Sequence, residues 1–98
     1  MILVTGSIVA RADSFERLLA LSLEHVRRSR TEQGCLAHAV HRDVENPLRL
    51  VFLEQWSDRA ALAAHFAVPG SRAFVAGVRE LAAEPPQIGV YEAEPVKV

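Results

Sequence analysis

The pattern of hydrophobic and polar positions predicts a strand followed by a long helix. Residues 2–10 are rich in β-branched side chains, which favour a strand. Asp13 and Glu16 then resemble a capping box, and no glycine or proline interrupts the chain before Gly34. We therefore expect an amphipathic helix that stops at Gly34. At about 100° per residue, its apolar stripe holds Phe15, Leu18, Leu19, Ser22, Val26 and Ser29.

A hairpin and a last strand are predicted further along the chain. Residues 35–44 and 48–56 both have strand character, and residues 45–47 between them are typical of a turn. Residues 87–96 form the last predicted strand, which Pro95 closes near its end. Because hairpin strands are neighbours, we expect an antiparallel sheet.

The helical region between these strands is predicted in two pieces. Ser57 or Asp58 can cap the first piece, which is rich in alanine. Pro69-Gly70 breaks the helix, and Ser71 can cap the second piece. The order of elements is therefore β-α-β-β-α-β. This order predicts the α+β, ferredoxin-like fold with a split second helix.

The predicted strands are apolar on both faces. The first strand carries Leu3 and Val9 on the face opposite Ile2, Val4 and Ile8, and the hairpin strands repeat this arrangement. The helices of one chain can cover only one face of the sheet. An open apolar face would be larger than soluble monomers usually tolerate. We therefore expect a homodimer packed sheet to sheet.

Composition and charge narrow the class of protein. Ninety-eight residues fit one domain, which we expect to span residues 1–98. A net charge of −1 gives no overall attraction to nucleic acid or to an anionic membrane, so neither is expected as a partner. The single cysteine, Cys35, excludes an internal disulfide. No apolar run approaches the ~18–20 residues that span a bilayer, and the start does not resemble a signal peptide. We expect a cytoplasmic location.

Standard chemical motifs are missing from the sequence. It contains no glycine-rich phosphate loop, no His-Glu-x-x-His zinc helix, no Gly-x-Ser-x-Gly elbow and no dinucleotide fingerprint. The four histidines are scattered along the chain, so no metal site is predicted from them. They remain the main candidates for chemistry near neutral pH.

His65 and His38 are the predicted catalytic residues. His65 lies late in the alanine-rich helix, where its ring can act as a general base at the edge of a cleft or simply cap the helix end. His38 is expected to share a strand face with Leu36 and Val40 and can line a pocket or an interface. His25 lies at the flank of the first helix, where a half-exposed boundary position is the favoured interpretation.

Aromatic and acidic residues complete the predicted substrate site. Trp56, Phe66 and Phe74 can supply flat apolar walls, although a core position is the simpler interpretation of Trp56. Glu54 lies on a largely apolar strand face, where it needs a partner such as Arg72 or Arg11. Tyr91 can bind a ligand hydroxyl or lie at the dimer interface. Together with His25, the predicted binding set is Trp56, Phe66, Phe74, Glu54 and Tyr91.

Two stretches of this chain resemble the antibiotic biosynthesis monooxygenase family. They are HVRRSRTEQGCLAHAVHRDVENP from His25 and FLEQWSDRAALAAHFAVPGSRAFV from Phe52. The most characteristic parts are Gly34-Cys35-Leu36, Glu54-x-Trp56, and Ala64-His65-Phe66 with Pro69. The resemblance implies a ferredoxin-like chain that dimerises through its sheet into an α+β barrel.

The resemblance also implies an activity, namely cofactor-independent oxygenation of a quinol or a polycyclic phenol by O₂. A deprotonated phenol is electron-rich enough to reduce O₂ itself, so the protein only has to bind a flat aromatic, hold one proton and exclude water. His65 is then the candidate base. A non-catalytic protein that binds small aromatics, and an isomerase with His65 and His38 as proton carriers, remain alternatives.

Some positions depart from the family pattern. Haem-degrading members resemble one another in an Asn, a Trp and a His, where this chain has Gly6 or Ser7, His65 and Val75. Haem degradation is therefore disfavoured. His38 replaces a frequent aromatic residue, and Gly70 replaces a frequent histidine, so the activity of this chain can differ from that of its relatives.

Overall fold

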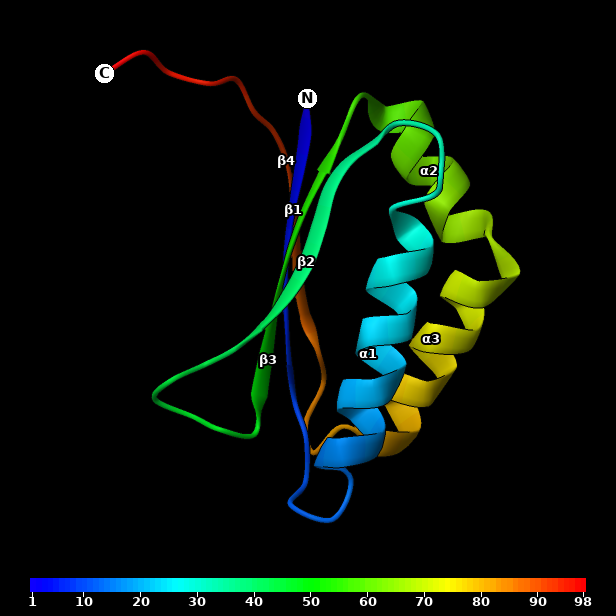
Figure 1. Cartoon of the computed structure of the whole chain (residues 1–98), viewed down its shortest axis with the longest axis vertical. Coiled ribbons are helices and arrows are strands. Elements are labelled where there is room, and N and C mark those ends of the chain that lie inside the picture. The colour runs from blue at the N-terminus through cyan, green and yellow to red at the C-terminus, as the bar shows by residue number, and fades with distance from the viewer.

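The computed structural model describes residues 1–98 and has the predicted ferredoxin-like α+β fold, with helices on one face of an antiparallel sheet (Figure 1). The four strands lie in the order β2-β3-β1-β4, and the second helical region is split as expected. The elements in chain order are β1 (Ile2–Val9), α1 (Phe15–Ser29), β2 (Cys35–Arg42), β3 (Arg49–Trp56), α2 (Arg59–Ala67), α3 (Pro69–Leu81) and β4 (Gln87–Glu92).

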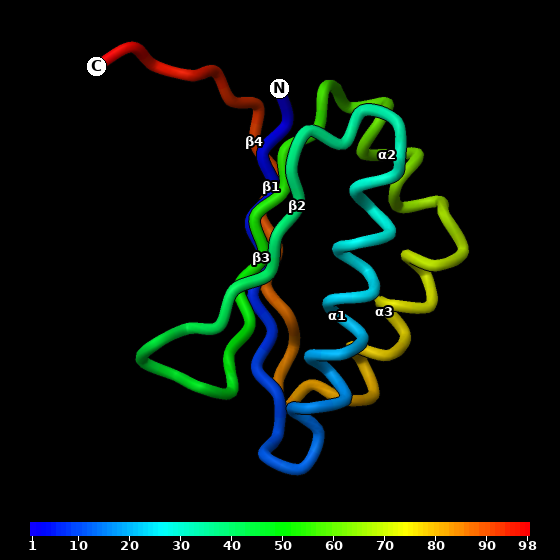
Figure 2. Tube along the Cα trace, in the orientation of Figure 1, coloured from blue at the N-terminus to red at the C-terminus, as the bar shows by residue number.

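The hydrophobic core lies between the sheet and the helices, which run along one side of the sheet in Figure 2. Strand alternation produces this core, because every second residue of β1 and β3 is buried on the helix side. A larger cluster forms around Leu18 and Phe52, and a smaller one forms around Val4 and Trp56. The predicted stripe of α1 is buried apart from Leu19, which is half-buried.

The start of α1 differs from the predicted capping box. Asp13 and Glu16 are exposed, and no side chain caps the first turn of the helix. Ser14 precedes the helix instead, and its hydroxyl donates a hydrogen bond to the Leu81 carbonyl at 2.7 Å. This long-range contact, which ties α1 to the end of α3, could not be read from local spacing.

The end of α1 also differs from the prediction. The helix stops at Ser29 rather than at Gly34, and the chain then turns into β2. Gly34 has a φ of 84°, a left-handed conformation that favours glycine. The glycine is thus needed for the turn before the strand rather than for the helix end.

A β-bulge at the start of β2 overturns one predicted face. The pairing register shifts between Cys35 and Ala37, so Leu36 does not share the buried face of His38. Leu36 is 57% exposed, whereas Cys35 packs against the smaller core cluster. Burial raises the pKa of the Cys35 thiol, which keeps it protonated and makes it a packing residue.

The break between the two helices lies one residue earlier than expected. Asp58 caps α2 by accepting a hydrogen bond from the Ala61 N–H at 2.8 Å, as predicted. Val68 separates the helices, and Pro69 is the first residue of α3 rather than only a breaker. Ser71 therefore lies inside α3 and does not cap it.

The second face of the sheet carries no helix (Figure 1). Leu53 on β3 and Tyr91 on β4 lie on this open face and are 46% and 53% exposed. The homodimer that would cover this face stays a prediction. No single helix has the length and apolar character needed to cross a membrane; α2 and α3 meet that test only when taken together, and they are bent by 69°.

The turn at Gly34 provides a test of the fold. A Cβ at this position would lie 2.5 Å from the Ala61 Cβ and 2.8 Å from the Ser57 Oγ. Gly34→Ala combines this clash with left-handed strain, so urea denaturation should show a loss of about 2–4 kcal/mol in the free energy of unfolding. Gly6→Ala is the matched control, because its Cβ would meet nothing closer than 3.5 Å. Equal stability of the two variants would contradict this description of the turn.

Candidate functional site

A cleft of about 400 Å³ lies between the helix side of the sheet and helices α1 and α3. Its walls include His25 of α1, His38 of β2, Phe52 and Glu54 of β3, and Phe74 of α3. The cleft reaches the β4 edge, where its lining residue Ile88 faces the helix side of the sheet and is still 64% exposed. A ligand can therefore enter from this edge. Apolar clefts with a few converging polar groups are the usual form of small-molecule sites.

Three of the four histidines converge beside this cleft, and two of them, His25 and His38, line it. His25, His38 and His65 are all buried, and one nitrogen of each ring lies within 4.8 Å of the others. The histidines are scattered along the sequence, but α1, β2 and α2 bring three of them together in space, which their spacing did not predict. His41, the fourth, is exposed, since residues three apart on a strand face opposite sides.

His38 is the least satisfied polar group of the cluster. Its side chain is sealed from solvent, and neither ring nitrogen has a hydrogen-bond partner. Burial lowers the pKa of His38 to about 4, helped by His65 and by the nearby Arg30 and Arg28. The ring is thus neutral at pH 7, with a lone pair that is free to accept a proton.

His25 is held in place from two sides. Its ring stacks on Phe74 with centroids 4.0 Å apart, and the Arg28 Nη2 lies 2.6 Å from its Nδ1. The residue is only 5% exposed, so the half-exposed position favoured from the sequence is wrong. Burial lowers the pKa of His25 to about 3, and the charges of His38, His65 and Arg28 act in the same direction.

Glu54 lies directly opposite His38 across the β2–β3 pair. The Trp56 indole N–H donates to its Oε1 at 2.9 Å, and its Oε2 lies 3.6 Å from the His38 Nε2. Burial raises the pKa of Glu54, although the bond from Trp56 opposes this shift. The partners expected from the sequence, Arg72 and Arg11, are not the ones that the structure gives it.

His65 lies behind this carboxylate rather than on the cleft wall. Its Nε2 is 4.0 Å from the Glu54 Oε1, and its Nδ1 is 2.8 Å from the Glu32 Oε1. The ring also packs against Trp56, with centroids 4.6 Å apart. His65 therefore reaches the cleft through Glu54.

The other predicted binding residues divide into two groups. Phe74 forms a wall of the cleft, whereas Trp56 is fully buried in the smaller core cluster and does not line the cleft. Phe66 and Tyr91 instead line a separate hollow of about 280 Å³ on the α2 side, so they do not join the histidine cleft. Phe52, which alternation places on the same strand face as Glu54 and Trp56, is a cleft wall that the predicted binding set did not include.

Arg28 and Glu32 were also missed, although their spacing carried a signal. They follow His25 by three and seven residues, and residues at such intervals lie on one face of a helix. Glu32 comes after the end of α1 and still continues this face. The two side chains form the outer layer of the site.

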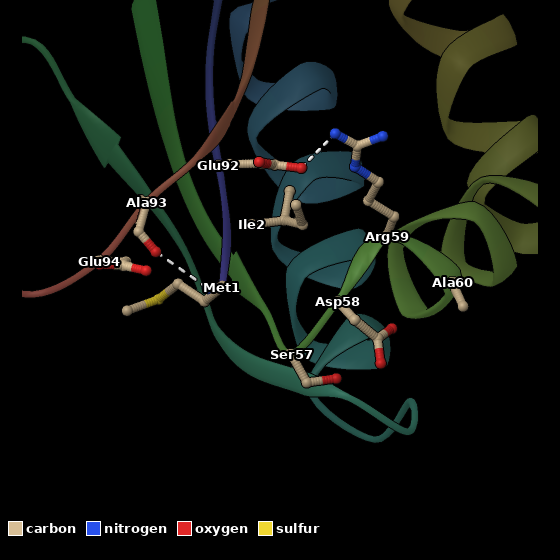
Figure 3. Close-up of a pocket in the computed structure, with 9 residues that line it drawn as sticks. All are labelled: Met1, Ile2, Ser57, Asp58, Arg59, Ala60, Glu92, Ala93 and Glu94. Atoms are coloured by element: carbon tan, nitrogen blue, oxygen red, sulfur yellow. Dashed lines mark hydrogen bonds and ion pairs between the residues drawn. The ribbon is translucent and has the colours of Figure 1, made fainter.

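A larger hollow of about 700 Å³ lies beside the N-terminus and does not contain this chemistry (Figure 3). Its polar groups are exposed, and an ion pair between Arg59 and Glu92 joins α2 to β4 across it. The N-terminal ammonium of Met1 donates to the Ala93 carbonyl at 3.0 Å. No buried titratable group faces this hollow, so the histidine cleft is the candidate site.

Three histidine rings raise the question of a metal ion. Arginine can only donate, so its contact with the Nδ1 of His25 leaves the ring proton of a neutral His25 on Nε2. A protonated nitrogen cannot ligate a metal. The cluster nitrogens lie within 4.8 Å of one another, and two nitrogens bound to one zinc ion at ~2.1 Å lie no more than ~4.2 Å apart. With its Nδ1 in contact with Arg28 and its Nε2 protonated, a neutral His25 offers no free nitrogen, so the rings as arranged do not supply three ligands to a metal ion.

A sequence model of the antibiotic biosynthesis monooxygenase family matches residues 1–77 of this chain. The chain belongs to this family. The match runs from β1 into α3 and includes all three converging histidines. The family resemblance inferred from the sequence is thereby confirmed.

Three similar proteins support this assignment. The chain is 35% identical to the uncharacterised protein sll1783 of Synechocystis over 93% of its length, and it spans 62% of that relative. The structure matches a candidate antibiotic biosynthesis monooxygenase from Deinococcus radiodurans with a TM-score of 0.94 and 27% identity, covering 100% of this chain and 98% of that one. It also matches Rv0793 from Mycobacterium tuberculosis with a TM-score of 0.91 and 25% identity, over 99% and 98% of the two chains.

The buried histidines predict that acid destabilises the protein. In the unfolded chain these rings have a pKa near 6.5, whereas in the folded chain the pKa of His38 is about 4 and that of His25 about 3. Between these values the unfolded state binds more protons, so the free energy of unfolding falls as the pH drops through this range. Urea denaturation should show a loss of about 1–2 kcal/mol for each of the two histidines between pH 7 and pH 5.

Variants show how much of the stability lost in acid is due to His38. His38→Gln should lose about 1–2 kcal/mol less than the wild type over the same interval, because it has no ring to protonate. His41→Gln is the control, because it makes the same substitution at an exposed histidine of the same strand. A His38→Gln protein with the full wild-type pH dependence would show that His38 is not held neutral.

Proposed function

We propose that this protein is a cofactor-independent monooxygenase that oxidises a quinol or a polycyclic phenol with O₂ in the histidine cleft. The observation that carries the proposal is His38, a buried neutral ring without a hydrogen-bond partner on the wall of an apolar cleft. A buried polar group left unpaired is costly, and an incoming hydroxyl would satisfy it. Membership of the family supports the same reaction class.

The cleft offers flat walls for an aromatic ring. The rings of Phe52 and Phe74 lie 5.9 Å apart, and both line the cleft. A volume of about 400 Å³ falls within the ordinary range of small-molecule sites. The apolar walls would also displace water from the bound substrate, which strengthens every electrostatic contact there.

Proton transfer is assigned to His38, with Glu54 behind it. The sequence favoured His65 as the base, but His38 lines the cleft and His65 does not. A substrate hydroxyl that gives its proton to His38 forms an imidazolium, and the Glu54 carboxyl 3.6 Å away would stabilise that charge. His65 then acts from behind, through Glu54.

The substrate anion supplies the electrons for O₂. For an anthrone-type carbon that carries two hydrogens, one oxygen atom of O₂ becomes the new carbonyl oxygen. The second oxygen atom leaves as water with both hydrogens, so no further reductant is needed. In this reaction the protein binds, orients and deprotonates the substrate.

Two proton carriers in one cleft also suit a second function. His38 and Glu54 could move a proton between two carbon atoms of a small metabolite, which is an isomerisation. This alternative requires no O₂. A protein that binds small aromatics without turnover is the third possibility, and the same experiment separates all three.

The test is oxygen consumption by chelator-treated protein with a panel of quinols and anthrones, after subtraction of autoxidation. We expect saturable uptake, and His38→Gln should lower it by about 10²–10⁴-fold because the general base is removed. His41→Gln, on the other face of β2, should turn over like the wild type. Product without oxygen uptake would favour isomerisation, and saturable binding without product would favour a binding protein. Either result would overturn the monooxygenase proposal.

We also propose that the protein is a homodimer through the open face of its sheet. Leu53 lies near the middle of that face and is 46% exposed, which supports a covered position in the assembled protein. Light scattering should give twice the mass of the chain for the wild type. Leu53→Glu should shift it to the monomer, because a charge would be buried in the interface. Ala20→Glu, on the exposed side of α1, is the control, and a monomeric wild type would refute the proposal.

A further inference from the structure

Gly70 is a glycine that the backbone conformation does not require. It is the second residue of α3, and Gly34 is the one glycine of this chain with a positive φ. A glycine within a helix costs backbone entropy, so its presence there calls for another reason. A Cβ at residue 70 would lie 2.6 Å from the Cζ of Arg28. The missing side chain of Gly70 therefore makes room for the guanidinium of Arg28.

The guanidinium lies in a place that the helix does not favour. It contacts the first turn of α3, with its Nη2 3.5 Å from the Ser71 hydroxyl, and the N-terminal end of a helix carries a partial positive charge. In this position its Nη2 lies 2.6 Å from the Nδ1 of His25, and its Nε lies 3.9 Å from the Glu32 carboxylate. A helical glycine and a cation at a helix N-terminus are both locally costly, and such departures mark functional positions.

The histidine cluster behind Arg28 has most of the features of a metal site. One nitrogen of each ring of His25, His38 and His65 lies within 4.8 Å of the others, and both ring nitrogens of His38 lack a hydrogen-bond partner. Metal-binding histidines usually donate their second N–H to a carboxylate, and the Nδ1 of His65 lies 2.8 Å from the Glu32 Oε1. Small ring rotations would bring the nitrogens within the ~4.2 Å that two ligands of one zinc ion can span.

The protonation and the charge of the cluster also suit a metal ion. A metal binds neutral imidazole, so a protonated ring has to lose its proton first. Burial lowers the pKa of His25 to about 3 and that of His38 to about 4, so neither ring holds this extra proton at pH 7. The Glu54 Oε2 lies 3.6 Å from the His38 Nε2 and would supply a negative charge beside the ion. Imidazole and carboxylate ligands together suit zinc and its neighbours cobalt and nickel.

Arg28 withdraws one ligand from this set. A guanidinium only donates hydrogen bonds, so the Nδ1 of a neutral His25 is the acceptor and its Nε2 carries the proton. The lone pair of His25 is thus occupied, and its other nitrogen is protonated. The charge of Arg28 is permanent at any ordinary pH and repels a second cation.

We propose that His25, His38 and His65 form a latent site for a divalent transition-metal ion, and that Arg28, seated on Gly70, keeps this site closed. Without the guanidinium, His25 can move its proton to one nitrogen and offer the other to the ion. With the guanidinium in place, the three rings remain available to give and accept protons. This inference goes beyond the proposed function, because it concerns a metal ion and involves no substrate.

Cobalt(II) binding tests the closed site, because cobalt(II) held by histidine ligands absorbs visible light. Chelator-treated wild type should show no saturable absorption, whereas Arg28→Met should bind one Co²⁺ per chain about 10–100-fold more tightly. Arg27→Met is the matched control, since it removes the same charge from an exposed neighbour on α1 and should behave as the wild type. In the Arg28→Met background, His25→Gln should abolish the absorption and His41→Gln should keep it.

Gly70→Ala opens the site in a second way. Its Cβ would displace the guanidinium of Arg28, which is the end of a flexible side chain, and alanine suits a helix better than glycine. We expect saturable Co²⁺ binding here as well. Zn²⁺ should raise the melting temperature of both open variants and leave that of the wild type unchanged, because a ligand of the folded state stabilises it.

Two results would overturn the inference. Wild type that binds Co²⁺ as tightly as Arg28→Met would show that Arg28 does not close the site. Arg28→Met that is folded by circular dichroism and binds no Co²⁺ would show that no latent site exists, and Gly70→Ala decides by the same criterion if Arg28→Met does not fold. Neither result depends on oxygen uptake, so the monooxygenase proposal and the latent site can fail separately.

Discussion

Three imidazole rings share one small space with a buried carboxylate, and this crowding governs the charge of the whole site. Two positive rings about 5 Å apart in a low-dielectric interior would repel strongly, and Arg28 and Arg30 add further positive charge nearby. Burial is the main reason that the pKa values of His25 and His38 are lowered, and these neighbouring charges act in the same direction. Neutral rings have one donor and one acceptor each, so the tautomer of each ring decides what it can do.

The outer partners of the rings then divide the roles. Arg28 donates to the Nδ1 of His25 and leaves its Nε2 as a donor, whereas the Nδ1 of His65 lies 2.8 Å from the Glu32 carboxylate. His38 has no outer partner at all and remains free to respond to a ligand. The three histidine rings thus differ in their partners: His25 contacts Arg28, His65 contacts Glu32, and His38 has no hydrogen-bond partner.

The fold supplies the space in which this arrangement works. The residues of β4 that face the helix side stay largely exposed, which leaves an open edge beside the histidines. The β2–β3 register places His38 directly opposite Glu54. The bulge at Leu36 lets Cys35 pair with Trp56 while the rest of β2 keeps this register. A shift of one residue would turn His38 to the other face of the sheet.

Much of the fold could be predicted from the sequence, because strand and helix periods are local. The alternation of β3 correctly placed Phe52, Glu54 and Trp56 on one buried face. The contact of Ser14 with Leu81 in place of a cap at Asp13, the bulge at Leu36 and the depth of His25 could not be predicted, since each depends on contacts with distant elements. The convergence of the three histidines has the same cause, because α1, β2 and α2 are separated by loops whose paths no local pattern specifies.

The layered arrangement also fits the proposed reaction, in which a hydroxyl rather than an ion enters the cleft. The cleft surface holds His25 and His38 as neutral groups, and the charges of Glu32 and Arg28 lie in the layer behind them. A phenol that enters brings no net charge into the apolar space, so its desolvation costs little. Its charge would arise only inside the cleft, when the proton moves to His38. The developing pair of charges is then compensated at the moment it forms, which is the condition for stabilising an electron-rich anion beside an apolar oxidant such as O₂.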